Sequence, residues 1–200
     1  MKTKLNIVKE KKFTVNNEFV TYGFYYNPAH FKKVTNKWSF MNKPSGGLWS
    51  SPKNSQWGWK DWCLSEMFKE KSYFRVGFKF KLKKSAKIFV LNTISDYLEL
   101  PEEYFIEQKY GYPGDPKSLN WEKLATEYDG FLLTETGLSE TRDLGFGLSS
   151  DSTGRVGFNA WDCETLLVFS LDCISEVKSL RFFTDYCDVT RKGDREEDNN

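Results

Sequence analysis

The residues with the clearest potential for ligand chemistry lie in one segment, KPSGGLWSSPKNSQWGWKDWC at positions 43–63. Its paired glycines allow the backbone to approach a ligand closely, because glycine carries no side chain. After them come an aromatic plane and two hydroxyl groups, in the order Gly47, Leu48, Trp49, Ser50 and Ser51. This combination favours a flat heterocycle as ligand. The pattern also fits a tight turn into a core strand, followed by a helix whose tryptophans pack inward.

Signatures of several other catalytic sites are missing from the sequence. It contains no P-loop, HExxH or GxSxG motif, and its single histidine, His30, excludes a metal site with two histidine ligands. No CxxC pair occurs among the four cysteines, so neither a zinc site nor a disulfide framework is indicated. We therefore expect no metal, and buried thiols at Cys63, Cys163, Cys173 and Cys187.

The elements that must position these residues are mostly strands. Short runs rich in aromatic and β-branched residues predict strands over residues 5–8, 19–26, 73–82, 87–91, 130–134, 165–170 and 178–185. The run YFRVGFKFKLK alternates, with Phe78 and Phe80 on one face and Lys79 and Lys81 on the other. Such alternation is typical of a strand with one buried face.

Three short helices are predicted between the strands. Ser55 can cap a helix that runs through Trp59 and Trp62 to Phe68, Asn120 can cap one that runs to Tyr128, and Thr93 with Asp96 can open one that ends at Leu100. Residues 110–116 and the glycine-rich residues 137–157 are expected to be loops. Residues 190–200 are charged and carry no apolar anchor, which predicts a disordered tail. The expected fold is one α+β domain over residues 1–189, with mostly antiparallel strands and a few short helices.

The composition also bears on where the protein acts. No apolar run approaches the roughly 18 residues that a membrane span needs, and the sequence MKTKLNIVKEKK at the start lacks the apolar segment of a signal peptide. We expect a cytoplasmic protein with no membrane partner.

Five motifs together resemble a known group of proteins: TYG at 21–23, GGLWSSP at 46–52, WGWKDWC at 57–63, EYDGFLL at 127–133 and WDCETLLVFSLDCI at 161–174. They look like a family of uncharacterised phage and bacterial proteins whose order of motifs is similar to the ADP-ribosyltransferase-like superfamily. The similarity spans residues 19–176. If the chain is encoded by a phage, its compartment would be the cytoplasm of the host cell.

The resemblance implies a split antiparallel β core that holds NAD, with the nicotinamide in a slot between two sheets. Tyr22 and Gly23 fall where the superfamily has a His or Arg before a glycine, and the segment from Gly47 through Leu48 and Trp49 to Ser50 and Ser51 takes the second cofactor-binding position. Glu164 falls at the catalytic position, where a carboxylate stabilises the oxocarbenium-like ribose. Alignment on Val168 and Phe169 can instead place Thr165 there, and Glu127 and Asp129 are further candidate acids.

The expected function is therefore transfer of ADP-ribose from NAD to a protein or nucleic-acid target. An alternative is a non-catalytic protein that binds a host protein or nucleic acid through the basic strand face of Arg75, Lys79, Lys81, Lys83 and Lys84. Tyr22, which stands where the superfamily has a His or Arg, favours this alternative. Residues 1–90 hold 19 Lys and Arg against 5 Asp and Glu, and residues 91–200 hold 10 against 23. This imbalance suits a nucleic-acid ligand, but the simpler interpretation is that the two halves neutralise each other within one fold. A third hypothesis is a carbohydrate-binding module with a platform of Trp49, Trp57, Trp59 and Trp62.

Overall fold

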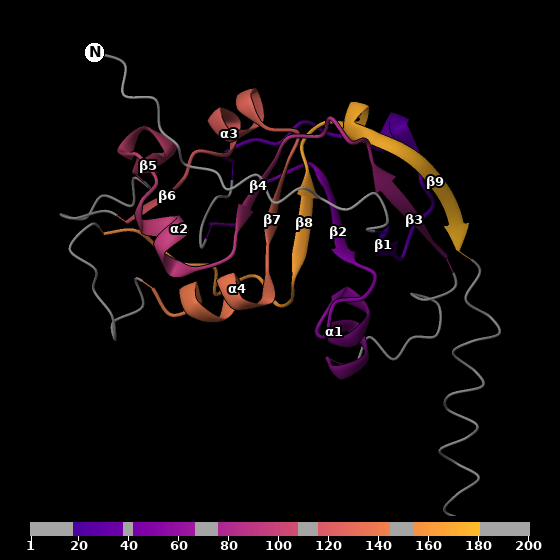
Figure 1. Cartoon of the computed structure of the whole chain (residues 1–200), viewed down its shortest axis with the longest axis horizontal. Helices are drawn as coiled ribbons and strands as arrows, with labels where there is room; N and C mark the ends of the chain where they lie inside the picture. The colour runs from indigo at the N-terminus through magenta and orange to yellow at the C-terminus, as the bar shows by residue number, and fades with distance from the viewer. Residues whose placement is uncertain (1–17, 38–41, 67–75, 108–115, 145–153, 181–200) are drawn as a thin grey trace, which may run out of the picture.

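The computed structural model describes residues 18–37, 42–66, 76–107, 116–144 and 154–180. In this part of the chain a seven-stranded sheet has the order β4-β7-β8-β2-β1-β3-β9, and a separate hairpin pairs β5 with β6 (Figure 1). Among these described strands, β4 and β7 pair in parallel and the other pairs are antiparallel. The strands are β1 (Glu18–Tyr22), β2 (Leu48–Pro52), β3 (Gly77–Leu82), β4 (Ile88–Leu91), β5 (Phe105–Glu107), β6 (Lys117–Leu119), β7 (Gly130–Leu133), β8 (Thr165–Val168) and β9 (Ile174–Leu180).

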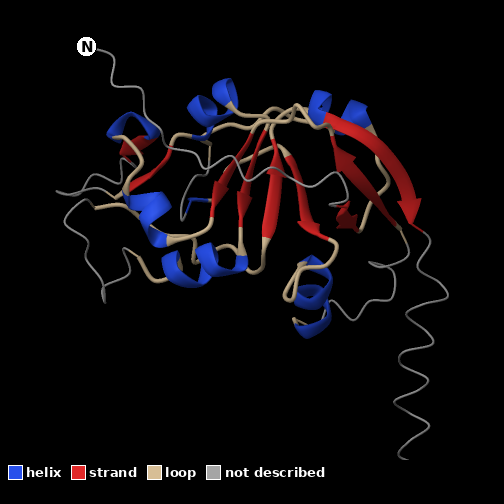
Figure 2. Cartoon of the chain, in the orientation of Figure 1, coloured by secondary structure: helices blue, strands red, loops and turns tan. Residues whose placement is uncertain are grey.

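In the described ranges four short α-helices accompany the sheet: α1 (Trp59–Ser65), α2 (Ile94–Leu98), α3 (Trp121–Glu127) and α4 (Glu135–Thr141). Figure 2 shows α1 on its own near the end of β2, apart from the other three helices. Among the described residues, no helix has both the length and the apolar character that a membrane crossing requires. The molecule is therefore a mixed α+β structure built on a large mixed sheet.

Local capping explains where two of these helices begin. The Thr93 hydroxyl accepts from the Asp96 N–H while the Asp96 carboxylate accepts from the Thr93 N–H, and this reciprocal pair starts α2. The side chain of Asn120 accepts from the Lys123 N–H and starts α3. Both caps confirm the predictions from the sequence.

Two sequence predictions about helices are wrong in part. Ser55 does not cap α1, because the helix begins after Gly58, whose N–H donates to the Asp61 carboxylate. Residues 135–141 form α4, which takes up the start of the glycine-rich loop expected over 137–157, and the Thr134 hydroxyl caps this helix. Glycine usually disfavours a helix, but at Gly137 the absence of a side chain lets α4 pack closely against β4. A Cβ at this position would lie only 2.4 Å from the Leu91 carbonyl oxygen.

Most predicted strands are present, with shifted ends. The predicted strand over 19–26 ends at Tyr22, where Gly23 takes a φ of 94° that turns the chain. Strand β9 begins at Ile174, earlier than the pattern indicated, and the hairpin of β5 and β6 was not predicted. The predicted strand over 5–8, nearly all of the loop over 110–116 and the tail over 190–200 lie outside the described residues.

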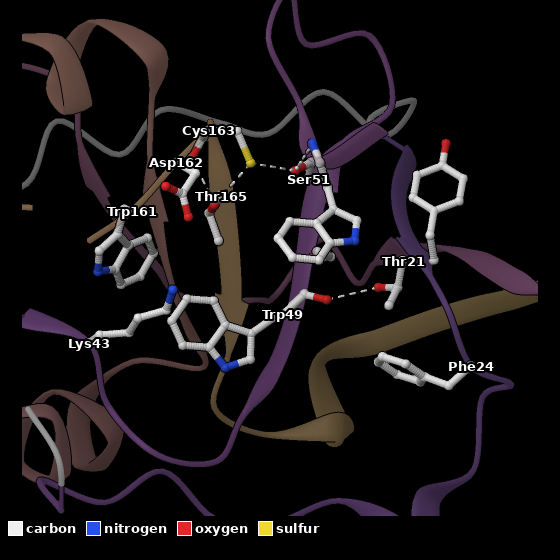
Figure 3. A pocket seen from close by; sticks show the side chains of 12 residues that line it. Thr21, Phe24, Lys43, Trp49, Ser51, Trp161, Asp162, Cys163 and Thr165 are labelled. Atoms are coloured by element: carbon white, nitrogen blue, oxygen red, sulfur yellow. Dashed lines mark hydrogen bonds between the residues drawn. The ribbon is translucent and has the colours of Figure 1, made fainter. Parts of the chain in front are cut away.

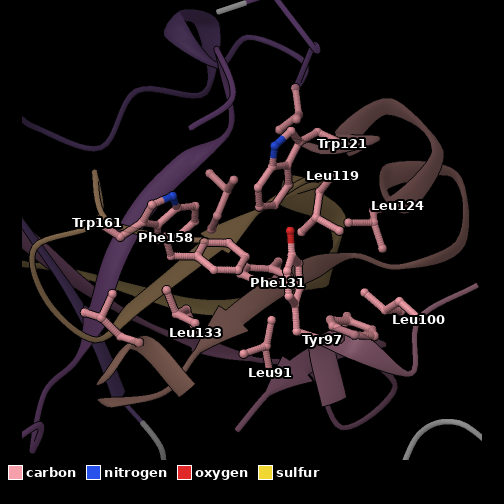
Figure 4. Close-up of a cluster of buried hydrophobic side chains, with 14 of the residues drawn as sticks. Leu91, Tyr97, Leu100, Leu119, Trp121, Leu124, Phe131, Leu133, Phe158 and Trp161 are labelled. Carbon is pink, nitrogen blue, oxygen red and sulfur yellow. The ribbon is translucent and has the colours of Figure 1, made fainter. Parts of the chain in front are cut away.

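The sheet is buried on both faces along its central strands. Every residue of β7 and β8 is buried. Phe131 belongs to an aromatic cluster with side chains from α2 and α3, and its ring centre lies 5.0 Å from that of Trp121 and 5.7 Å from that of Trp161 (Figure 4). The neighbouring Leu132 belongs to a second cluster that includes Phe78. This alternation between two clusters explains the continuous apolar runs of both strands.

The sheet separates at its middle. Strand β2 pairs with β8 through Leu48, Trp49 and Ser50, but it pairs with β1 only through Ser51 and Pro52. Beyond these two residue pairs the ladder between β1 and β2 stops, and the Thr21 hydroxyl donates to the Trp49 carbonyl at 2.9 Å. A side chain thus bridges the strands where they diverge.

Candidate functional site

A cavity of about 290 Å³ lies where β1 and β2 diverge, and we call it the β1–β2 pocket (Figure 3). Its volume lies near the lower end of the roughly 300–1,000 Å³ of ligand pockets. It suits a single ring-bearing group rather than an entire dinucleotide. Five aromatic side chains line it, those of Tyr22, Phe24, Trp49, Trp59 and Trp161. The other lining residues are Thr21, Lys43, Ser50, Ser51, Asp162, Cys163 and Thr165.

Hydrogen bonds and ring contacts within the protein fix the aromatic side chains that line the pocket. The Trp49 indole N–H donates to the Gly46 carbonyl and the Trp161 indole N–H donates to the Asn42 carbonyl, both at 2.9 Å. The centres of the Trp49 and Trp161 rings lie 4.8 Å apart. Trp59 stacks on Trp62, with ring centres 4.9 Å apart. With these N–H groups satisfied by the protein, Trp49 and Trp161 present apolar ring surface to a ligand.

The two serines predicted to bind a ligand line the pocket, but their hydroxyls already hold the structure together. The Ser50 hydroxyl donates to the Leu166 carbonyl at 3.0 Å. The Ser51 hydroxyl donates to the Glu164 carbonyl at 2.7 Å and accepts from the Trp59 N–H at 2.9 Å. Ser51 therefore joins β2 to the first turn of α1 and to the residues that precede β8.

Two charged side chains line the pocket without forming an ion pair. Lys43 donates one hydrogen bond, to the Ala160 carbonyl at 3.0 Å, and its ammonium group lies 5.8 Å from the centre of the Trp49 ring. The backbone of Asp162 is fixed, because its carbonyl accepts from the Trp57 indole N–H at 3.1 Å. Within the described part of the chain, the Asp162 carboxylate accepts no side-chain or backbone hydrogen bond. These two groups are thus available for a ligand.

The remaining titratable groups of the pocket stay neutral at ordinary pH. Burial raises the pKa of Tyr22 to about 12. Burial also raises the pKa of the Cys163 thiol, which keeps it protonated. Since the thiolate is the nucleophilic form of cysteine, Cys163 is a packing residue here and no candidate nucleophile.

Four of the eight predicted site residues line the pocket: Tyr22, Trp49, Ser50 and Ser51. Leu48 is buried in the second core cluster instead. Gly23 and Gly47 both have positive φ and lie outside the lining, and a Cβ on Gly47 would lie 2.4 Å from the Leu167 side chain. These two glycines serve the turns that lead out of β1 and into β2.

The predicted catalytic residue, Glu164, lies elsewhere. Its carboxylate accepts a hydrogen bond from the Ser55 hydroxyl at 2.6 Å, and Thr165 lines the pocket in its place. The physical reason is the alternation of side chains at the start of β8, which turns neighbouring residues to opposite sides. The carboxylate that does line the pocket is that of Asp162, two residues earlier.

The further candidate acids also lie outside the pocket lining. Glu127 accepts from the Tyr104 hydroxyl at 2.6 Å, and Asp129 accepts from the Lys87 N–H at 2.8 Å. No cluster of three or more His, Cys, Asp or Glu side chains suited to a metal ion occurs among the residues that the structure describes.

Two of the five cations of the basic strand face are paired with carboxylates. Lys79 pairs with Glu18 at 2.7 Å, and Lys81 pairs with Glu176 at 3.1 Å. Arg75 lies outside the described residues, so Lys83 and Lys84 are the exposed cations that remain of the five. The four tryptophans of the proposed carbohydrate platform also differ in setting, because Trp49 and Trp59 line the pocket whereas Trp57 is exposed.

Sequence reasoning missed Lys43 and Asp162 as site residues. Both lie inside segments already singled out, Lys43 at the start of the segment over 43–63 and Asp162 in the motif WDCETLLVFSLDCI, so a charged residue within an aromatic motif was the available signal. No protein-family model, no curated protein and no solved structure matches this chain.

Proposed function

We propose that the protein binds NAD, or a related nucleotide, in the β1–β2 pocket and transfers ADP-ribose to a protein or nucleic-acid target. The observation that carries the proposal is an unpaired carboxylate, Asp162, among aromatic walls at the place where the large sheet separates. The resemblance to the ADP-ribosyltransferase-like superfamily implies a slot of this kind between two sheets. The geometry and the motifs therefore support the same ligand class.

The nicotinamide ring of NAD is flat and positively charged. Aromatic faces attract such a ring through stacking and through their negative π-surface, and base–aromatic stacking contributes roughly 1–3 kcal/mol per ring. Trp49, Trp59 and Trp161 supply this surface, and the Asp162 carboxylate supplies a counter-charge. The pocket volume of about 290 Å³ suits this end of the dinucleotide.

The same carboxylate would serve the chemical step. When the bond between the nicotinamide nitrogen and the ribose carbon breaks, the electron pair leaves with nicotinamide and positive charge develops on the ribose. A fixed carboxylate stabilises that charge. A nucleophile of the target then donates the electron pair of the new bond to the ribose carbon and loses its proton. We assign to Asp162 the role that the motif alignment gave to Glu164.

The test compares Asp162→Asn with Glu164→Gln, which removes a nearby charge outside the pocket. NAD binding is followed by tryptophan fluorescence, and nicotinamide release is measured with and without a cell lysate as the source of acceptors. We expect Asp162→Asn to lower release by about 10²–10³-fold, as the loss of one electrostatic contact does in other enzymes, and Glu164→Gln to stay within a few-fold of wild type.

Three outcomes would change the proposal. A wild-type protein that does not bind NAD would remove both the binding and the transferase role. Binding without nicotinamide release would leave a nucleotide-binding protein that is not a transferase. Loss of release in Glu164→Gln but not in Asp162→Asn would return the catalytic role to Glu164.

A further inference from the structure

The two available charges of the pocket have opposite hydrogen-bonding character. The Lys43 ammonium only donates, and the Asp162 carboxylate only accepts. They form no ion pair with each other, yet both line the β1–β2 pocket, and Figure 3 shows them on the side of the pocket where Trp161 lies. A donor and an acceptor thus lie near one point of an aromatic pocket, with neither used up by the other (Figure 3).

We propose that the β1–β2 pocket selects planar rings whose edge carries a hydrogen-bond acceptor beside a hydrogen-bond donor, with Lys43 donating to the acceptor and Asp162 accepting from the donor. A primary carboxamide on a ring has this edge, and so does a ring nitrogen next to an amino group, as in adenine. This inference rests on the proposed function, and it states which chemical feature of the ligand the pocket recognises.

The aromatic walls alone would not discriminate among flat rings, because every such ring has a π-face. Lys43 and Asp162 discriminate among rings because they disfavour every ring whose edge does not match their donor and acceptor. A ring carboxylate offers Lys43 an acceptor but brings a negative charge against Asp162. A ring with an apolar edge leaves both charges without a partner in a partly desolvated site, which costs binding free energy.

Nicotinamide and nicotinic acid make a matched pair of probes, because they differ only in whether the ring carries a carboxamide or a carboxylate. We expect the wild-type protein to bind nicotinamide at least tenfold more tightly than nicotinic acid, as loss of one charge-assisted hydrogen bond would give. Adenine and unsubstituted purine form a second pair of probes. Whichever of nicotinamide and adenine binds more tightly identifies the ring of a dinucleotide that the pocket takes. Dissociation constants come from tryptophan fluorescence or calorimetry on the full chain.

Variants of the two charged residues then separate their roles. Asp162→Asn should bring nicotinic acid to within about threefold of nicotinamide, because the repulsion of its carboxylate is gone. Lys43→Met should weaken nicotinamide binding by about tenfold, because it removes the ammonium donor and keeps an unbranched side chain of similar length. Glu164→Gln and Lys53→Met are the matched controls outside the pocket, and circular dichroism establishes that each variant is folded.

The results distinguish this inference from the proposed function. If the wild type binds NAD but shows equal affinity for nicotinamide and nicotinic acid, the inference is overturned while NAD binding stands. Unchanged selectivity in both pocket variants would likewise overturn it. If none of the rings nor NAD binds, the proposed function fails together with it. Should Asp162→Asn not fold, Asp162→Ser supplies the same comparison without the charge.

Discussion

Asn42 is the polar residue on which the packing behind the pocket depends most. Its side chain is completely buried, and its carbonyl holds the Trp161 indole N–H at the pocket wall. Its amide oxygen accepts from the Leu119 N–H at 2.6 Å, and its amide nitrogen donates to the Val156 carbonyl, to the Gly157 carbonyl at 3.2 Å and to the Tyr97 hydroxyl at 3.0 Å. One side chain thus connects four segments that are distant in sequence.

Replacement of Asn42 by alanine removes these bonds where water cannot replace them. The Tyr97 hydroxyl continues to satisfy the Val156 carbonyl, so the groups that lose their Asn42 partner are mainly the Leu119 N–H and the Gly157 carbonyl. Each buried polar group without a partner costs about 1–3 kcal/mol. Asn42 also has a φ of 57°, a conformation that alanine adopts at an added cost of about 1 kcal/mol.

Asn42→Ala should therefore lower the free energy of unfolding by roughly 3–7 kcal/mol, out of the 5–15 kcal/mol typical of a domain. The measurement is urea unfolding followed by tryptophan fluorescence, with an osmolyte present in all samples so that the variant remains folded at the start. The matched control is Asn36→Ala, because Asn36 also bonds through both side-chain groups but is only half-buried. We expect about 1 kcal/mol for this control, since water can take over its bonds. Equal losses in the two variants would refute the argument from burial.

Two further predictions concern the framework of the sheet and the turn before β2. The hydrogen-bonded pair with Lys79 lowers the pKa of Glu18 to about 2, below its value in the unfolded chain, so the stability that Glu18 contributes is present above roughly pH 4 and is lost as the pH falls toward 2. Glu18→Gln should show a smaller loss of stability between pH 6 and pH 2.5 than wild type in urea titrations, and an equal loss would argue against the pair. Gly46→Ala should destabilise the protein far more than Gly154→Ala, because both glycines have positive φ but a Cβ at Gly46 would lie 2.2 Å from the Lys33 carbonyl oxygen, whereas Gly154 has open space. Thermal unfolding of both variants measures the difference, and similar melting temperatures would contradict the close approach.

The sequence pattern was sufficient for elements whose signal is local. Alternation located Phe78 and Phe80 on the buried face of β3, and capping residues located the starts of α2 and α3. The sequence pattern did not predict elements whose conformation depends on a contact with a distant part of the chain. Gly137 has the identity of a helix breaker, and only the close approach of the Leu91 carbonyl explains its place in α4.

The candidate site shows the same division between local and distant information. The motif around Trp49, where aromatic residues and glycines are grouped, identified a segment that contributes Trp49, Ser50 and Ser51 to the pocket lining. Which of Glu164 and Thr165 enters the pocket depends on the register of β8 against its neighbours, and a shift of one residue exchanges the two. A single sequence does not determine that register.

The divergence of β1 from β2 also explains why some polar residues near the pocket have a structural role and others are available to a ligand. Where the ladder ends, the Thr21 hydroxyl bridges the two strands, and Ser51 joins β2 to α1 and to the chain before β8. The hydroxyls that indicated a ligand site in the sequence thus make hydrogen bonds that fix the strands and loops around the cavity. In the proposed function, ligand recognition therefore falls to Lys43 and Asp162. Both residues lie outside the strands, where the side chains are not needed to hold strands together.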